Sequence, residues 1–406
     1  MIKKILKSLL AVFALIFLVL TGLYFIPPKQ ERIQYDYKQI EKNPLLNSRV
    51  GWYKSSNNKN YQITWGSQDG LQLNYFDSLR NNLKNLRLTH IEGNKFSTDK
   101  NLKTVEVNFE FDNIDSISIL NVKTSKTEFT ATKLKNEFYK QEEVEYFNGD
   151  VRLAGLLMTP YNTNKSTAVV FIHGSGISDR NSFWYMHQAN YLARNGYMVL
   201  LPDKRGCGKS EGEWHTASFQ DFSDDITAAL NYLSNNKKTE FSKKGVIGIS
   251  QGGWISHLVN KDTKDLDFII DVVGASTTPN EQLKFEIMND IKNSGAPEFV
   301  AKPLSIVFAK RARGKRKIWW DKNGEFDPIP LMSKSDTKIL KIFANEDENV
   351  PVTESQARIK ELLKSNPSLS LDIKILENSG HALFSKNTNW IREDYLKFLN
   401  NWISQL

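Results

Sequence analysis

One serine of this chain stands in a sequence pattern that is typical of a catalytic nucleophile. Ser250 lies in Gly-Ile-Ser-Gln-Gly, directly after the apolar run 246–249 and before a helical pattern. A strand that turns sharply into a helix lifts a serine hydroxyl above the sheet, and larger residues at Gly248 and Gly252 would clash in so tight a turn. The pattern therefore predicts an exposed, nucleophilic hydroxyl on Ser250.

A serine hydroxyl needs a base, and that base needs a carboxylate to fix its tautomer. Of the six histidines, His381 follows the last predicted strand, and Asp347 follows the strand before it. Glu346 and Glu348 flank Asp347 and are the alternatives for the carboxylate. Because the ends of parallel strands meet at one edge of a sheet, we expect Ser250, Asp347 and His381 to form a triad. This chain order differs from the orders in chymotrypsin and subtilisin.

A serine nucleophile that attacks a carbonyl also needs backbone N–H groups to stabilise the oxyanion. We expect one donor from Gln251, which follows the nucleophile. The other is expected from the glycine-rich stretch His-Gly-Ser-Gly at 173–176, with Ser175 as the donor and Gly174 as the alternative. His173 is interpreted as a structural residue that orients this loop.

Apolar strands that alternate with helices must position these residues. Continuous apolar runs predict strands at 168–172, 198–201, 246–249, 268–273, 339–343 and 371–376. Helical patterns lie at 219–233, at 354–363 with Thr353 as the N-cap, and at 390–403. Strands buried on both sides and separated by helices predict a mostly parallel, doubly wound α/β sheet within residues 141–406.

Residues 29–140 have a different pattern. Apolar and polar residues alternate in segments such as 105–111 and 117–122, and Asn-, Ser- and Gly-rich stretches separate the segments. This alternation predicts a small antiparallel β domain. A further hairpin is predicted where Asn148-Gly149 separates two alternating runs, because this dipeptide favours a tight turn.

The first 28 residues form a separate segment. Three lysines precede an apolar run of 18 residues from Leu9 to Ile26 that is broken only by Thr21 and Gly22. A helix of this length is ~27 Å long, enough to span a bilayer core. We expect a transmembrane signal anchor at 1–28 that leaves the rest of the chain on the extracytoplasmic side. The alternative is a cleaved signal peptide and a secreted protein.

The composition is that of a folded protein. Of 406 residues, 40% are hydrophobic and 25% charged, which excludes a disordered chain and a protein with many membrane spans. The single cysteine, Cys207, excludes a disulfide within the chain and is interpreted as an inert thiol. A net charge of +8 is mild for this length, and we expect no nucleic-acid partner.

The motifs together resemble the α/β-hydrolase superfamily, most closely the bacterial esterases and serine-peptidase-like hydrolases that join a β-rich N-terminal domain to this fold. The matching motifs are 173–176, Asp179-Arg180, 203–210, the Ser250 turn, Asp347 with Val350-Pro351, and Gly380-His381. The resemblance implies hydrolysis of carboxylic esters through an acyl-enzyme, without a metal or cofactor. It leaves the substrate open, because relatives include peptidases, thioesterases and acyltransferases. Asp179 and Arg180 are expected to form a local ion pair that braces the oxyanion loop.

Some sixty residues separate the predicted strands 268–273 and 339–343, which is too many for a plain connection. Residues 280–335 are therefore interpreted as a cap insertion; they hold 11 basic and 7 acidic residues. Six basic residues fall within 310–317, followed by Trp319 and Trp320. The basic run is either a solvated cap helix or a contact with anionic lipid headgroups. Trp319, Trp320 and Trp254 are the candidates for lining an acyl pocket.

We therefore predict an exported carboxylesterase that acts on a small acyl ester. A serine aminopeptidase on the same triad is the alternative, and it should place carboxylates near the site to hold a substrate's amino group. Glu281 and Glu286 are the candidates for that role. A second alternative, from a different class, is a catalytically silent envelope protein that binds through its β domain.

Overall fold

The computed structural model describes thirteen ranges of the chain. These are residues 49–55, 60–65, 71–77, 82–98, 106–113, 116–123, 128–134, 138–161, 166–180, 182–236, 240–263, 265–385 and 390–406. The transmembrane helix predicted at residues 1–28 lies outside them. Within the described ranges, no helix combines the length and the apolar composition needed to cross a membrane.

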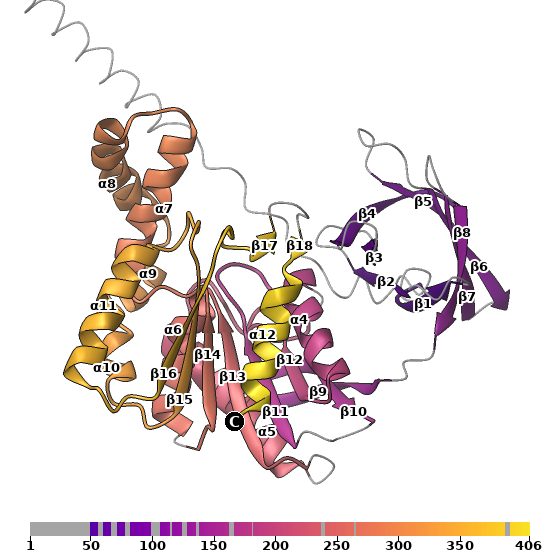
Figure 1. Cartoon of the computed structure of the whole chain (residues 1–406), viewed down its shortest axis with the longest axis horizontal. Helices are drawn as coiled ribbons and strands as arrows, with labels where there is room; N and C mark the ends of the chain where they lie inside the picture. Colours follow the sequence, from indigo (N-terminus) through magenta and orange to yellow (C-terminus); the bar gives the residue numbers. More distant parts are fainter. Residues whose placement is uncertain are drawn as a thin grey trace, which may run out of the picture. The chain divides into compact units, whose positions relative to one another are not determined.

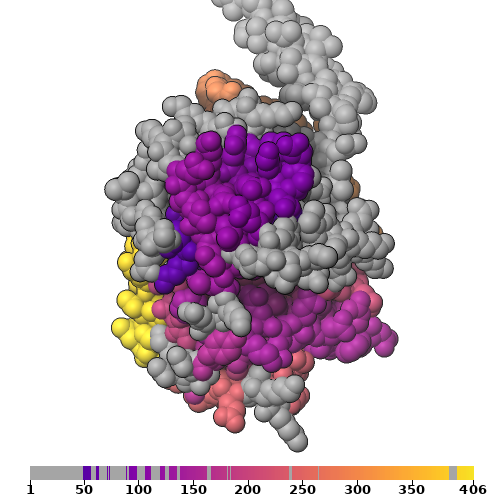
Figure 2. Space-filling view, turned by 90° about the vertical axis from the view of Figure 1, so that its right-hand side faces the viewer, coloured from indigo at the N-terminus to yellow at the C-terminus, as the bar shows by residue number. Residues whose placement is uncertain are grey.

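The N-terminal part of the described chain is an antiparallel β domain, as the alternating pattern predicted. Its strands close into a barrel in which β1 pairs with both β2 and β8 (Figure 1). Figure 2 shows the outer surface of these strands in indigo and purple. The strands are β1 (Gly51–Ser55), β2 (Asn60–Trp65), β3 (Leu71–Asp77), β4 (Asn82–Glu92), β5 (Lys95–Thr98), β6 (Glu106–Asn113), β7 (Ser116–Lys123) and β8 (Glu128–Leu134).

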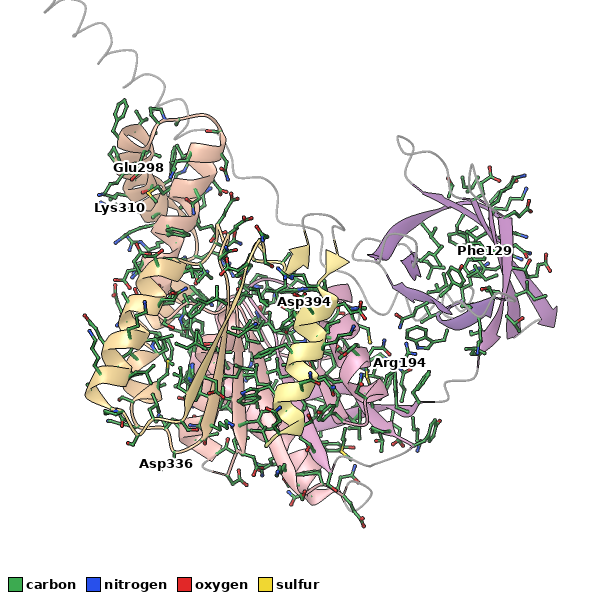
Figure 3. All side chains as sticks on the ribbon, in the orientation of Figure 1. Phe129, Arg194, Glu298, Lys310, Asp336 and Asp394 are labelled. Atoms are coloured by element: carbon green, nitrogen blue, oxygen red, sulfur yellow. The ribbon has the colours of Figure 1, made fainter. Side chains whose placement is uncertain are left out.

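Aromatic side chains fill much of the barrel interior. The rings of Phe96 and Phe109 meet edge to face at 5.5 Å, and Tyr53 lies 6.4 Å from Phe109. Tyr61 stacks on Phe129, which is labelled in Figure 3. Aromatic and aliphatic residues that alternate with polar ones along each strand explain why one side of these strands is buried.

The second part is built on an eight-stranded sheet in the order β16-β15-β14-β13-β11-β12-β10-β9. β11 to β16 run parallel, while β10 pairs antiparallel with β12 and with β9. The prediction of a mostly parallel sheet is confirmed. The strands are β9 (Tyr139–Asn148), β10 (Val151–Pro160), β11 (Thr167–Ile172), β12 (Met198–Pro202), β13 (Lys243–Ile249), β14 (Phe268–Val272), β15 (Lys338–Ala344) and β16 (Leu371–Leu376).

Helices cover both faces of this sheet (Figure 1). In β11, Val170 and Ile172 pack on one face, with α5 (Phe219–Asn235), α6 (Gln251–Thr263) and α11 (Val352–Ser365). Val169 and Phe171 point to the other face, with α4 (Phe183–Arg194) and α12 (Glu393–Ser404). Because successive residues alternate between two buried faces, the strands are apolar throughout.

The predicted insertion between β14 and β15 is helical. It consists of α7 (Pro279–Asn293), α8 (Glu298–Lys315), α9 (Lys317–Asn323) and α10 (Ile329–Met332). Thr278 is the N-cap of α7: its side chain accepts from the backbone N–H of Glu281, and the side chain of Glu281 accepts from the backbone N–H of Thr278. α8 packs along α7, and its buried residues are the small side chains Ala301, Ser305 and Ala309.

Two predicted element boundaries were wrong. Helix α11 begins at Val352 after Pro351, one residue before the expected cap Thr353. Trp390 was expected to begin the last helix, but Trp390–Ile391 is a short strand, β18, which pairs with β17 (Phe384–Ser385). α12 begins only at Glu393. Acidic residues at the start of a helix are stabilised by its dipole, which favours the later beginning.

Candidate active site

Ser250 occupies the sharp turn between β13 and α6 that the sequence predicted. Its φ of 56° lies in the left-handed region that is strained for non-glycine residues. A Cβ atom on Gly248 would lie 2.1 Å from the carbonyl oxygen of Gly252. A Cβ atom on Gly252 would lie 2.3 Å from the carbonyl oxygen of Ile172. The turn can therefore form only with glycine at both positions.

The structure brings Ser250, His381 and Asp347 into one hydrogen-bonded chain. Nδ1 of His381 lies 2.8 Å from Oδ2 of Asp347, and Nε2 lies 3.0 Å from Oγ of Ser250. Since a carboxylate accepts, Nδ1–H donates to Asp347 and Nε2 accepts from the serine hydroxyl. The ring is thus held in the tautomer that a general base for Ser250 requires.

Asp347 is fixed by its own loop. Its Oδ1 accepts hydrogen bonds from the backbone N–H groups of Asn349 and Val350, both at 2.9 Å. Its side chain is 1% exposed, whereas that of His381 is 20% exposed. The neighbouring Glu348 points elsewhere and accepts from the side-chain amide of Asn293 at 3.0 Å. Within the described part of the chain, Asp347 is the acid of this loop that hydrogen-bonds to the histidine.

The backbone N–H groups that the sequence suggested as oxyanion donors differ in their availability. The N–H of Gly174 donates to the hydroxyl of Tyr185 at 2.8 Å, so the alternative donor Gly174 is already engaged. Among the described residues, the N–H of Ser175 has no backbone acceptor. Gln251 is the first residue of α6, and the first N–H groups of a helix have no acceptor within the helix. Ser175 and Gln251 both line the cavity beside Ser250.

The loop that carries Ser175 is held by buried polar contacts. His173 donates from Nε2 to the carbonyl of Pro202 at 2.6 Å and accepts at Nδ1 from the hydroxyl of Ser178 at 2.7 Å. Burial lowers the pKa of His173 to about 4, so the ring is neutral at pH 7. Nζ of Lys204 donates to the carbonyls of Gly174 and Gly176, at 2.9 and 3.1 Å. The lysine was not expected from the sequence to brace this loop.

Arg180 takes part in a buried ion pair that differs from the expected local pair with Asp179. Its guanidinium binds both carboxylate oxygens of Asp203, at distances down to 2.7 Å. The two side chains are 4% and 0% exposed. The contact ties the loop after β11 to the loop after β12. Cys207 lies in that second loop, where burial raises the pKa of its thiol to about 11 and keeps it unreactive.

A cavity of about 180 Å³ opens beside Ser250, between the sheet edge and the helical insertion. The three tryptophans that the sequence singled out all line it: Trp254, Trp319 and Trp320. Trp254 is fixed by a hydrogen bond from its indole N–H to the carbonyl of Thr277 at 3.1 Å. Trp319 and Trp320 meet edge to face at 4.8 Å.

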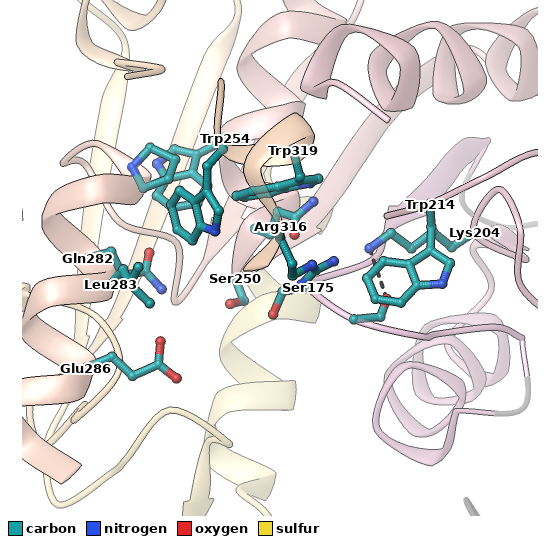
Figure 4. A pocket seen from close by; sticks show the side chains of 14 residues that line it. Ser175, Lys204, Trp214, Ser250, Trp254, Gln282, Leu283, Glu286, Arg316 and Trp319 are labelled. Atoms are coloured by element: carbon teal, nitrogen blue, oxygen red, sulfur yellow. Dashed lines mark hydrogen bonds between the residues drawn. The ribbon is translucent and has the colours of Figure 1, made fainter. Parts of the chain in front are cut away.

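Charged residues also line this cavity: Glu286, which the sequence analysis named as a candidate for holding a substrate's amino group, and two cations that it did not place in the site. The cations are Lys204 and Arg316, which lie on one side of Ser250, with Glu286 on the other (Figure 4). Burial, followed by the nearby Asp290, raises the pKa of Glu286. The basic run 310–317 did point to Arg316, but only as one of six equivalent surface charges. The missed signal was Gly314, which weakens the helix just before the chain turns at Arg316.

Comparison with known proteins finds a matching family model and similar solved structures. Residues 163–309 match the family model described as serine aminopeptidase, S33. The esterase Pf2001 of Pyrococcus furiosus is similar at 18% identity and a TM-score of 0.49, over 66% of this chain and 90% of that one. Dienelactone hydrolase from Anabaena variabilis is similar at 15% identity and a TM-score of 0.45, over 66% and 98%. Identities this low carry no information on substrate.

The sheet order and the strained serine turn define the fold of the second part of the chain. It is an α/β-hydrolase fold, and an antiparallel β domain precedes it. Its site has the general features of a serine hydrolase, because a serine at the turn after a parallel strand faces a histidine base across a hydrogen bond.

Proposed function

We propose that the protein hydrolyses carboxylic esters, with Ser250, His381 and Asp347 as its catalytic triad. The observation that carries the proposal is the hydrogen-bonded chain from Ser250 through His381 to Asp347, built on a serine with a strained φ of 56°. Hydrogen bonds fix both the aspartate and the histidine, so the base is oriented before a substrate binds.

In the first half of the reaction, Oγ of Ser250 attacks the ester carbonyl while Nε2 of His381 takes its proton. The backbone N–H groups of Gln251 and Ser175 stabilise the negative oxygen of the tetrahedral intermediate. The imidazolium of His381, held by Asp347, then gives its proton to the leaving alcohol oxygen. The carbon–oxygen bond breaks, and the acyl group remains on Ser250.

In the second half, a water molecule enters at the place of the alcohol. Nε2 of His381 takes a proton from the water as its oxygen attacks the acyl carbonyl. The second tetrahedral intermediate collapses, the acid leaves, and Oγ of Ser250 regains the proton. Each proton passes through one nitrogen, which lies 3.0 Å from Oγ.

Covalent labelling tests this proposal. We expect a fluorophosphonate probe to label the purified full-length chain and to lose that label in Ser250→Ala. Turnover of p-nitrophenyl acetate, butyrate and octanoate then gives the length of acyl chain that the cavity accepts. A folded wild-type chain that resists the probe would exclude a reactive Ser250.

A serine aminopeptidase is the second candidate, and the position of Glu286 favours it. Its carboxylate lines the cavity beside Ser250, where it would attract the ammonium group of an aminoacyl substrate. Glu281, the other candidate, accepts hydrogen bonds from Thr278 in a capping box instead. Faster cleavage of an aminoacyl p-nitroanilide than of p-nitrophenyl esters, lost in Glu286→Gln, would support the peptidase over the esterase.

We also propose that the hydrolase acts on the extracytoplasmic side, anchored by the apolar run from Leu9 to Ile26. Three lysines before this run favour retention of the N-terminus in the cytoplasm. The proposal predicts that the chain stays in the membrane fraction after alkaline carbonate extraction and is degraded by protease added to spheroplasts. A mature N-terminus that lacks the apolar run would indicate a cleaved signal and a secreted enzyme.

A further inference from the structure

The cavity beside Ser250 has a cationic wall. Arg316 and Lys204 both line it, and Figure 4 shows them on the side of Ser250 opposite to Glu286. An aromatic wall alone would serve a neutral acyl group, and Lys204 braces the oxyanion loop, so the position of Arg316 in this wall calls for a separate explanation. The positions of Arg316 and Lys204 relative to the rings of Trp214 and Trp319 give that explanation.

Arg316 is held by aromatic rings. Its Cζ lies 4.8 Å from the ring centroid of Trp214 and 5.8 Å from that of Trp319. It stands at the junction of α8 and α9 with φ −124° and ψ 43°, outside the helical region. The chain therefore changes direction at this residue, which carries the guanidinium into the cavity wall. Contact with aromatic faces orients the planar fork of an arginine, whose geometry matches that of a carboxylate.

Lys204 adds a second positive charge to the same wall. Its Nζ lies 5.6 Å from the ring centroid of Trp214 and donates to two carbonyls of the oxyanion loop. Burial, together with repulsion from the like charge of the nearby Arg316, lowers the pKa of Lys204 to about 8. An anion placed beside Arg316 would relieve this repulsion, whereas a cation would increase it.

We propose that Arg316 recognises a free carboxylate on the substrate, so that the preferred substrates are short esters that carry a negative charge, such as half-esters of dicarboxylic acids. This inference rests on the proposed ester hydrolysis at Ser250. Glu286, across Ser250, repels the same carboxylate and so favours one orientation of the ester. The cavity volume of about 180 Å³ suits an ester whose acid part has only a few carbon atoms.

A matched pair of esters tests this subsite. Monoethyl succinate carries a carboxylate where ethyl 4-methylpentanoate carries an isopropyl group, and ethanol release reports both. We expect Arg316→Gln to lower kcat/KM for monoethyl succinate by about 10- to 100-fold while changing that for the neutral ester less than about 3-fold. Arg316→Lys keeps the positive charge but not the planar guanidinium. Its kcat/KM for monoethyl succinate should lie between those of the wild type and Arg316→Gln.

Controls separate this proposal from the proposed function. Lys310→Gln removes an exposed charge from the same basic run and should alter neither ester. Equal losses for both esters in Arg316→Gln, or none, would overturn the carboxylate subsite while leaving the proposed esterase activity intact.

If the wild type cleaves neither ester, a binding titration tests the subsite instead. Glutarate is added while tryptophan fluorescence is measured, because Trp214 and Trp319 flank Arg316. A response in the wild type that Arg316→Gln lacks supports the subsite, and no response in the wild type overturns it.

A second, independent observation concerns the outer face of α8. This helix buries small side chains and exposes large apolar ones: Phe299, Ile306 and Val307 are 80%, 56% and 53% exposed. Exposed Lys302 and Lys310 lie on the same face, since the spacings of three and four residues place them together. Figure 3 labels Lys310 and Glu298 on this helix. Large apolar residues interspersed with lysines are typical of helices that lie at a membrane surface.

We infer that this face of α8 contacts an anionic lipid bilayer. The run 310–317 adds positive charge beside the apolar residues, and each charge near an anionic surface contributes about 1 kcal/mol to binding. An apolar protein partner alone would not call for such an excess of basic residues. The cap would then rest on the membrane, and the cavity that it covers would lie near the lipid surface.

A fluorescent label at the end of α8 tests this contact in the full-length chain. Gly314 suits the label because it is exposed and a Cβ atom there would meet nothing within 4 Å. We expect NBD on Gly314→Cys to shift to the blue in phosphatidylglycerol vesicles and not in phosphatidylcholine vesicles. The change Ile306→Glu with Val307→Glu should abolish the shift.

The matched control is the same label on Asp336→Cys, an exposed site elsewhere on the hydrolase (Figure 3). It should give the same emission in both kinds of vesicle. Equal emission from Gly314→Cys in both vesicles would overturn the lipid contact. So would a blue shift that grows with protein concentration in the absence of vesicles, which would instead assign the face to a second copy of the chain.

Discussion

The carbonyl oxygen of Gly252 lies 2.1 Å from the point where a Cβ atom on Gly248 would stand. Real Cβ atoms do not approach backbone oxygen so closely, so any side chain at position 248 must displace the start of α6. The hydroxyl of Ser250, between the two glycines, moves with that helix. The positive φ of Ser250 and the absence of a side chain at Gly248 are thus two consequences of one tight turn.

Gly248→Ala should therefore destabilise the fold and reduce activity together. We expect a loss of about 2–4 kcal/mol in the free energy of unfolding, because the added methyl group meets backbone and not a flexible side chain. Gly314→Ala is the matched control, since a Cβ atom there meets nothing within 4 Å. It lies in α8 and should be neutral or stabilising by up to about 1 kcal/mol. Urea unfolding of both variants measures the difference.

Asp347→Asn should lower kcat by about 10⁴-fold with little change in stability. The carboxylate fixes the tautomer of His381 through the 2.8 Å contact with Nδ1, and an amide can present its N–H to that atom and reverse the tautomer. Glu348→Gln is the control, because Glu348 contacts Asn293 and not the histidine. Hydrolysis of p-nitrophenyl butyrate by the three proteins gives the comparison. A similar loss in both variants would argue against Asp347 as the carboxylate that orients the base.

The parts of the site that the sequence predicted are those that the backbone alone determines. Ser250, Asp347 and His381 each follow a strand of a parallel sheet, and such strand ends share one edge. Their meeting therefore follows from strand order. The need for glycine at 248 and 252 likewise follows from the turn, without knowledge of any distant residue.

The parts that were missed depend on contacts between distant side chains. The carboxylate that binds Arg180 is Asp203, 23 residues away in the sequence, and no local pattern marks it. The engagement of the Gly174 N–H depends on how α4 carries Tyr185 over the loop. Arg316 differs from the other basic residues of 310–317 in that it lines the cavity, at the point where α8 has ended at Lys315. Gly314 marks a weak point of the helix, but a run of similar charges does not show which of them the turn carries into the cavity.

The buried histidines should make stability fall in acid. Burial lowers the pKa of His173 and of His187 to about 4, below the value of 6.5 for an exposed histidine. The unfolded chain therefore binds more protons than the folded chain between these values. The stabilisation is complete above about pH 6.5 and is lost as the pH falls toward 4, by up to about 3 kcal/mol for each ring.

Urea unfolding at pH 7, 5.5 and 4.5 measures this loss. His187→Gln removes one of the titrating groups, so its unfolding free energy should fall less between pH 7 and 4.5 than that of the wild type. His215→Gln is the control, because the side chain of His215 is 51% exposed. Identical pH slopes in the wild type and His187→Gln would show that His187 does not contribute.

A buried ion pair beneath the serine turn gives the last prediction. Asp271 in β14 and Lys341 in β15 stand opposite each other in register, form an ion pair, and are 1% and 0% exposed. Nε2 of His257 in α6 lies 3.3 Å from the same carboxylate. A Cβ atom on Gly253 would lie 2.1 Å from Oδ1 of Asp271, so the carboxylate fills the space directly under the start of α6.

Lys341→Met should be more harmful than the double change Lys341→Met with Asp271→Asn. The single change leaves a carboxylate buried without its cation, which costs about 3–5 kcal/mol, whereas the double change removes both charges and is expected to recover more than half of the loss. Because Asp271 supports the turn of Ser250, the single variant should also lose fluorophosphonate labelling before it unfolds in urea. If the two variants were equally stable, the lysine would be a packing residue, and the charge of Asp271 would not depend on it.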